Sequence, residues 1–254
     1  MRRPFPIRSV LARAALLIVG GVLSCRVAAG ELTVSAAASL TNAFRELATQ
    51  FEARHANMQV QLNFAGSGAL VQQIALGAPV DVLACADEAT MDRAQQQGLI
   101  DVTQRRDFAS NQLVVIVPKG DKAPGSLDEI AQLERVAIAR PASVPVGRYA
   151  QIALDQAGLW NAIQPRVIGA QSARQVLDYV ARGEVDAGFV YATDAAAMSD
   201  KVSVAFMVSS SGPILYPVAP VKGSSAREEA ALFIDFIHSP EARAVLAKHG
   251  FGMP

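Results

Sequence analysis

Residues 32–87 read LTVSAAASLTNAFRELATQFEARHANMQVQLNFAGSGALVQQIALGAPVDVLACAD. Short apolar runs at residues 32–35, 60–64 and 80–83 are typical of strands. Between the first two runs, apolar side chains at spacings of 4, 3 and 4 predict one buried helical face: Leu40, Phe44, Leu47 and Phe51. Strands that alternate with helices favour an α/β fold, in which a mostly parallel sheet carries helices on both faces.

The same alternation continues to the end of the chain. Further strands are predicted at residues 113–117, 135–139, 167–168, 187–191, 201–208 and 214–221. Further helices are predicted at residues 69–75, 88–97, 148–157, 173–182, 227–238 and 241–249. We divide these elements, about nine strands in all, into two α/β lobes, residues 30–110 plus 214–254 and residues 111–213. The last helices are expected to pack back on the first lobe.

The first 29 residues have the layout of a secretory signal peptide. They contain five arginines and no acidic residue, with an apolar run at residues 14–23 and small residues near the end. This pattern predicts cleavage after Ala29 and export to the periplasm. The apolar run is shorter than a permanent membrane helix requires. Residues 22–25, Val-Leu-Ser-Cys, allow an alternative in which a lipid on Cys25 anchors the protein.

Composition restricts the class of protein. The 254 residues are 51% hydrophobic and 18% charged, so the chain can bury a large core and is not intrinsically disordered. Lys plus Arg and Asp plus Glu both number 23, and residues 30–254 keep 18 basic against 23 acidic side chains. The resulting net charge of −5, without a basic run, argues against nucleic acid as a partner.

The sequence lacks the motifs of common enzymes. None of its histidines belongs to an HExxH or other paired metal-binding spacing: His55, His238 and His249. GxSxG, Walker A and GxGxxG motifs are also missing. We therefore expect neither an enzyme nor a cofactor. Cys85 is expected to be a buried, unreactive thiol, and Asp81 and Asp87 are expected to have structural roles.

Four predicted helices begin directly after a strand, at a small or flexible residue. Ser39 and Ser67 lie at the first two turns, Val146–Gly147 at the third and Ser172–Ala173 at the fourth. One interpretation is that the serines are N-caps, which accept hydrogen bonds from the first amides of a helix. The other is that four helix starts, each with free N–H donors and a partial positive charge, face one cleft and bind an anion. Open α/β sheets bind ligands at the carboxyl ends of their strands, where these turns lie.

Five stretches of the chain resemble a known family. They occur in order along residues 31–254 and read AAASLTNAFRELATQFE, FAGSGALVQQIALGAPVDVLACAD, NQLVVIVPKG, VPVGRYAQIALDQAG and GFVYATDA. These stretches are similar to the periplasmic molybdate-binding proteins of ABC importers. The resemblance implies the two-lobed type II periplasmic binding-protein fold. It also implies that molybdate, and with it tungstate, is enclosed between the lobes as a transported ligand and delivered to an inner-membrane ABC permease.

The resemblance also assigns the contacts to the ligand. Ser39 and Ser67 would each supply a hydroxyl and a backbone N–H, Val146 and Ala173 would each supply a backbone N–H, and Tyr191 would supply its phenol O–H. All five would contact the oxyanion oxygens, with no direct ligation of the metal atom.

Some features leave alternatives open. Gly66 stands where serine is usual in the family, and Cys85 stands where serine is common. Tyr191 has a second interpretation, as a core tyrosine bonded to a backbone carbonyl. Three other functions also stay open: a sulfate or other small-oxyanion binder of the same fold, an exported hydrolase, and a ligand-sensing regulatory domain. No large apolar patch is predicted, so a monomer is expected.

Overall fold

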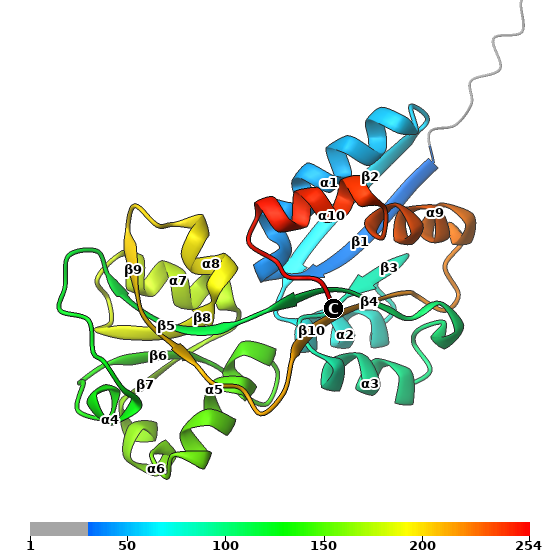
Figure 1. The fold of residues 1–254 in the computed structure, drawn as a ribbon. Helices are drawn as coiled ribbons and strands as arrows, with labels where there is room; N and C mark the ends of the chain where they lie inside the picture. Colours follow the sequence, from blue (N-terminus) through cyan, green and yellow to red (C-terminus); the bar gives the residue numbers. More distant parts are fainter. Residues whose placement is uncertain (1–29) are drawn as a thin grey trace, which may run out of the picture.

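Two lobes, each built on a five-stranded sheet, make up the protein in the computed structural model (Figure 1). The structure describes residues 30–254. The predicted signal peptide, residues 1–29 with Cys25, lies outside the described residues. Within the described range, no helix is both long and apolar enough to cross a membrane.

The first lobe contains a sheet with the strand order β2-β1-β3-β10-β4. Its strands are β1 (Gly30–Ala37), β2 (Met58–Ala65), β3 (Val82–Ala84), β4 (Arg106–Asn111) and β10 (Ile214–Pro220). β2, β1 and β3 pair in parallel, whereas β10 pairs antiparallel with β3 and β4. Four strands therefore run in one direction, and β10 runs against them.

The second lobe repeats this arrangement with the strand order β7-β6-β8-β5-β9. Its strands are β5 (Leu113–Pro118), β6 (Val136–Ala139), β7 (Val167–Ala170), β8 (Ala187–Tyr191) and β9 (Val202–Val208). Here β5 is the strand that runs against the other four, because it pairs antiparallel with both β8 and β9. The predicted α/β class with two mostly parallel sheets is confirmed.

Two adjacent crossings join the lobes, and they involve the reversed strands (Figure 1). The chain leaves the first sheet with β4, passes through Gln112 and enters the second sheet as β5; it returns from β9 to β10. β4 was not predicted from the sequence. Its stretch, Arg-Asp-Phe-Ala-Ser-Asn, lies at a sheet edge with only Phe108 and Ala109 buried, so it lacks the apolar run of a central strand.

Helices cover both faces of each sheet. In the first lobe they are the 3-10 turn η1 (Ala38–Leu40), α1 (Thr41–Arg54), α2 (Ser67–Ala75), α3 (Glu88–Gln96), α9 (Arg227–Ile237) and α10 (Pro240–Lys248), with η2 (Val102–Gln104) beside them. In the second lobe they are α4 (Leu127–Ile130), α5 (Pro145–Gln156), α6 (Trp160–Ile163), η3 (Gln164–Arg166), α7 (Ala173–Ala181) and α8 (Ala192–Ala197). α2 and α5 begin two and three residues before the predicted positions, because glycine or proline in their first turns hides the start of the helical pattern.

The apolar face predicted for the first helix is confirmed, since Leu40 at the end of η1 and Phe44, Leu47 and Phe51 in α1 are all fully buried. An aromatic cluster joins this helix to α9. The ring centroids of Phe51 and Phe233 are 5.1 Å apart, and those of Phe44 and Phe233 are 6.3 Å apart. The tail helices thus pack on the first lobe, beside α1 (Figure 1).

Replacing Phe233 with alanine is expected to lower the free energy of unfolding by ~3–5 kcal/mol, because the substitution leaves a cavity at the centre of the aromatic cluster. Chemical denaturation followed by circular dichroism measures the change. Leu232→Ala is the control on the same helix: Leu232 is 47% exposed, and its replacement should change stability by less than about 1 kcal/mol. Equal effects of the two substitutions would contradict the predicted packing.

Candidate functional site

A small cavity of about 10 Å³ lies where the carboxyl ends of β1, β2 and β3 face the helix starts of the second lobe. Its volume is close to the space that one water centre needs, so the two lobes meet closely around it. The first lobe contributes Ala37, Ala38, Ser39, Ala65, Gly66, Ser67 and Ala86. The second lobe contributes Val144, Pro145, Val146, Ala173 and Tyr191.

All five residues that the resemblance singled out lie on this cavity: Ser39, Ser67, Val146, Ala173 and Tyr191. The first four lie at helix starts, in η1, α2, α5 and α7. Within residues 30–254, no backbone carbonyl accepts a hydrogen bond from the amides of Ser67, Val146 or Ala173. This agrees with the geometry of a helix, whose first N–H groups have no acceptor inside the helix. The fold therefore gathers free amide donors, each at the positive end of a helix dipole, around one small cavity.

The N-cap interpretation is wrong for two of the three serines. Neither Ser39 nor Ser67 caps a helix with its hydroxyl, whereas the hydroxyl of Ser172 accepts a hydrogen bond from the amide of Gln175, at 3.2 Å, and caps α7. Gly66 holds the N-cap position of α2, which leaves Ser67 as the first helical residue. The two cavity serines thus keep their hydroxyls for other partners.

The hydroxyl of Ser67 is oriented by the first lobe. Its oxygen accepts a hydrogen bond from the amide of Ala86, at 3.1 Å, and the side chain is fully buried. Because a hydroxyl has one hydrogen and two lone pairs, this bond leaves the Ser67 hydrogen free to donate.

Ser39 belongs to a chain of hydrogen bonds that the sequence did not reveal. The Ser39 hydroxyl lies 3.1 Å from the Tyr216 hydroxyl, which also accepts a hydrogen bond from the Asn111 amide at 3.2 Å. The Tyr216 O–H can then donate to Ser39, so the Ser39 O–H can point into the cavity. Tyr216 resembles any core tyrosine in a strand, and Asn111 ends the strand that was not predicted, so no pattern distinguished either residue.

Tyr191 makes the bond that its second interpretation predicts, and it also borders the cavity. Its hydroxyl donates to the backbone carbonyl of Ala86 at 3.3 Å, as a core tyrosine would, and its side chain also lines the cavity. Burial, followed by the nearby Tyr216, Tyr149 and Asp87, raises the pKa of Tyr191 well above its usual value. The phenol therefore stays protonated and can act as a donor.

The residues that line the cavity, all within the described range, carry no charged side chain. One neighbouring cation, Arg174, follows Ala173 but borders a separate cavity of about 210 Å³. Its guanidinium lies 3.4 Å from the fully buried carboxylate of Asp194, whose pKa burial raises to about 6, while Arg174 opposes that rise. The positive charge of Arg174 is thus largely balanced inside the second lobe.

The other polar and thiol groups near the site behave as structural groups. Asp81 accepts hydrogen bonds from the Thr33 amide at 2.8 Å and from the Ser224 hydroxyl at 2.6 Å. Asp87 caps α3 through the amide of Thr90. Cys85 is fully buried, as predicted, and burial raises the pKa of its thiol far above its usual value. Among residues 30–254, no cluster of three or more His, Cys, Asp or Glu side chains could hold a metal ion.

Two glycines mark where the backbones of the lobes touch. The amide of Gly68 donates to the carbonyl of Ser143 at 3.0 Å. A Cβ atom at Gly68 would lie 2.3 Å from that oxygen, and one at Gly66 would lie 2.6 Å from the carbonyl oxygen of Gln171. Both distances are shorter than van der Waals contact, so this closed arrangement of the lobes requires glycine on each side of Ser67.

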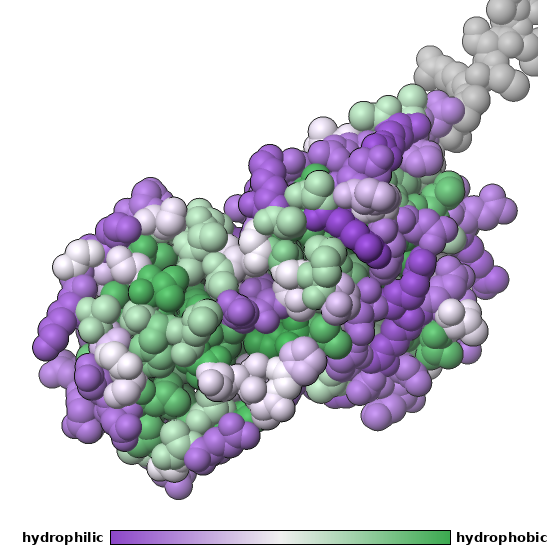
Figure 2. All heavy atoms as spheres, viewed as in Figure 1, coloured by the Kyte–Doolittle hydropathy of each residue, from purple (hydrophilic) through white to green (hydrophobic). Residues whose placement is uncertain are grey.

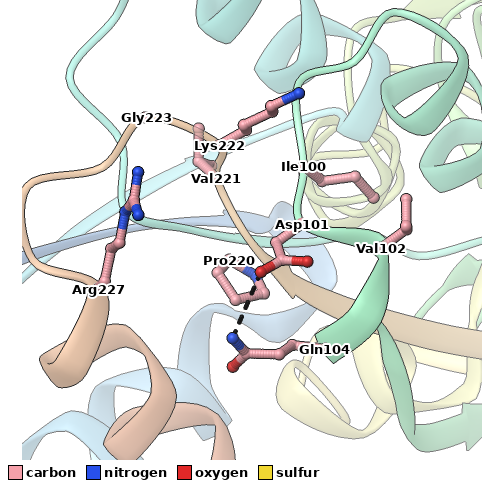
Figure 3. Close-up of a pocket in the computed structure, with 9 residues that line it drawn as sticks. All are labelled: Ile100, Asp101, Val102, Gln104, Pro220, Val221, Lys222, Gly223 and Arg227. Carbon is pink, nitrogen blue, oxygen red and sulfur yellow. Dashed lines mark hydrogen bonds between the residues drawn. The ribbon is translucent and has the colours of Figure 1, made fainter.

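Another cavity, of about 360 Å³, lies elsewhere on the first lobe, between residues 100–104 and residues 220–227. Figure 3 shows that Asp101 and Gln104 form a hydrogen bond beside this cavity, whereas Lys222 and Arg227 point in different directions. None of the five predicted site residues borders it.

The face of the molecule drawn in Figure 2 shows more apolar side chains on the second lobe than on the first.

This fold and cavity define a class: a two-lobed α/β protein with a small cavity, free of charged side chains, between its lobes. A family model described as bacterial extracellular solute-binding protein matches residues 32–252, and the chain belongs to this family.

The chain is similar to several named solute-binding proteins. The chain is 37% identical to YvgL of Bacillus subtilis, named as an ABC transporter substrate-binding lipoprotein, over 87% of this chain and 85% of that protein. It is 35% identical to the molybdate-binding protein ModA of Escherichia coli, over 92% and 96% of the two chains. The periplasmic molybdate-binding protein of Azotobacter vinelandii has a similar structure, with a TM-score of 0.74, 25% identity and coverage of 88% of this chain and 99% of that one.

Replacing Gly68 with alanine is expected to keep the lobes from closing, because its Cβ would overlap the Ser143 carbonyl. Small-angle X-ray scattering with sodium molybdate added should give a larger radius of gyration for Gly68→Ala than for the unmodified protein. Gly212→Ala is the control, since a Cβ there meets no atom within 4 Å. An equally compact Gly68→Ala protein would contradict the proposed contact.

Proposed function

We propose that this protein captures molybdate, and also tungstate, in the cavity between its lobes and delivers it to an ABC permease of the inner membrane. One observation carries the proposal: Ser39, Ser67, Val146, Ala173 and Tyr191 line a single cavity between the lobes. In this role the protein is a transport component and not an enzyme, and molybdate is its cargo and not a cofactor.

The donor set suits a fully deprotonated oxyanion. Molybdate at neutral pH is a dianion whose four oxygens only accept hydrogen bonds. The cavity offers amide N–H and hydroxyl O–H groups, and helix starts add partial positive charge. Phosphate at this pH carries a proton, and a cavity of donors would leave that proton without an acceptor, at a cost of ~1–3 kcal/mol. The chemistry of the donors therefore disfavours phosphate.

Sulfate is the alternative ligand that donor chemistry does not disfavour, because it is also an unprotonated dianion. Molybdate and tungstate are larger than sulfate, so discrimination has to come from the size of the cavity. Glycine contacts and backbone donors hold that size more rigidly than flexible side chains would. A smaller ion would leave some donors too far for a good hydrogen bond.

Each side chain has a defined part in the proposed binding. Ser67 donates its free hydrogen while Ala86 holds its oxygen, and Ser39 does the same through Tyr216. Tyr191 exchanges its bond to the Ala86 carbonyl, at 3.3 Å, for a bond to the anion. Val146 and Ala173 donate from the backbone, so their side chains are free to differ among relatives.

The proposed location is outside the inner membrane. The extracellular solute-binding family supports export, and the signal-peptide pattern of residues 1–29 suggests the periplasm. A lipid anchor at Cys25 is the alternative. The chain is proposed to act as a monomer that presents its closed form to the permease.

Isothermal titration calorimetry with molybdate, tungstate, sulfate and phosphate tests the function. Molybdate and tungstate are expected to bind tightly with one site per chain, and sulfate and phosphate are expected to bind weakly or not at all. Sulfate affinity equal to that of molybdate would instead support the general oxyanion binder.

Ser39→Ala and Ser67→Ala are each expected to weaken molybdate binding by ~1–3 kcal/mol, the usual cost of losing a hydrogen bond to a charged group. The same titration measures the loss. Ser126→Ala is the control, because Ser126 caps α4 and does not border the cavity. If both cavity variants bound molybdate as tightly as the control, the proposed site would be wrong.

A further inference from the structure

Two charged side chains from different lobes pair beside the cavity. Asp87 follows β3 in the first lobe, and Arg148 belongs to α5 in the second. Nη1 of Arg148 donates to Oδ2 of Asp87. The Asp87 side chain is only 3% exposed and that of Arg148 is 24% exposed, so the pair is shielded from water. Neither residue lines the cavity, and neither was assigned a role in binding.

The pair connects the two segments that build the cavity. Asp87 directly follows Ala86, whose amide holds the Ser67 hydroxyl and whose carbonyl accepts from Tyr191. Arg148 lies two residues after Val146, on the same helix start. We propose that Asp87 and Arg148 form a latch between the lobes, and that these positioning residues help set how long the closed protein retains its anion. This inference rests on the proposed function.

The hydrogen bonds of Asp87 show that one of its carboxylate oxygens has Arg148 as its partner in the closed form. Oδ1 of Asp87 accepts from the Thr90 amide at 3.0 Å, so Oδ2 depends on Arg148 in the closed form. When the lobes separate, water can replace Arg148 at Oδ2. Closing without the arginine would bury a carboxylate that lacks its counter-charge, which is costly. The pair thus stabilises the closed form relative to the open one.

Arg93, on the same helix as Thr90, makes another polar contact between the lobes. Nη1 of Arg93 donates to the backbone carbonyl of Ala142 at 3.4 Å, and Nη2 donates to the Thr90 hydroxyl at 3.2 Å. The Arg93–Ala142 bond is long and has an uncharged acceptor, so it is weaker than the ion pair. Arg148 is therefore the better target for a test.

Arg148 could affect an anion in another way, as a distant positive charge. A double-mutant cycle separates the two effects. Asp87→Asn keeps a good N-cap residue while removing the negative charge, and Arg148→Met keeps much of the length of the side chain. If the pair acts as a latch, Arg148→Met weakens molybdate binding in the unmodified protein and has little effect in the protein that already carries Asp87→Asn. If Arg148 acts only as a distant positive charge, Arg148→Met weakens molybdate binding equally in the unmodified protein and in the Asp87→Asn protein.

The experiment measures molybdate binding and release by calorimetry and stopped-flow fluorescence for the full mature chain. Arg148→Met is expected to bind at least about tenfold more weakly, mainly through faster dissociation, as for other buried pairs that lose one partner. The midpoint of thermal unfolding without molybdate should change little, because each sheet keeps its own contacts. Arg135→Met is the matched control, since Arg135 pairs with Asp186 within the second lobe at 3.3 Å.

The outcomes are distinguishable. If the unmodified protein binds none of the oxyanions, the proposed function fails. If it binds molybdate but Arg148→Met matches Arg135→Met, or if the cycle shows no coupling between Asp87 and Arg148, the latch is overturned. Coupling together with faster dissociation supports it.

Discussion

The unpaired amides at the starts of α2, α5 and α7 are the feature on which the rest of the site depends. A buried N–H group without a partner is costly, and these groups lie around an enclosed space. The fold tolerates them only if something that accepts hydrogen bonds can occupy that space. In the proposed function a small oxyanion would meet this need, since each of its oxygens has lone pairs to share. The hydroxyls of Ser39 and Ser67 extend the same set of donors.

This arrangement explains why the site has no cationic side chain on its surface. A lysine or arginine would attract any anion, and it could adjust to ions of different size. Backbone amides are fixed by the helices that carry them, and the helices are fixed by the sheets beneath. The charges nearby are paired with one another, as in Arg174 with Asp194 and Arg148 with Asp87. The selectivity proposed for the cavity is therefore a property of the packed scaffold.

The two lobes meet through a few contacts of different kinds. Glycine at positions 66 and 68 allows backbone to touch backbone, and the Asp87–Arg148 pair adds a charged contact nearby. Asn111 joins the lobes at the crossing, since its amide donates to Tyr216 in the first lobe and to Thr193 in the second. The chain of hydrogen bonds from Asn111 through Tyr216 to Ser39 links the crossing strands to the cavity. Lobe position and hydroxyl orientation are thus coupled in the closed form.

The sequence by itself determined the α/β class, the buried apolar face of the first helix and the strand-to-helix turns at Ser39, Ser67, Val146 and Ala173, because apolar spacing and turn residues are local signals. It also carried the family resemblance that singled out Tyr191. It did not reveal β4, whose edge position needs few apolar side chains, nor did it decide whether the serines were N-caps. Only the tertiary structure decided that the Ser39 hydroxyl meets Tyr216, that Ser67 meets Ala86 and that Asp87 meets Arg148. These partners are separated by 177, 19 and 61 residues along the chain, and contacts of that kind depend on how the sheets bring distant segments together.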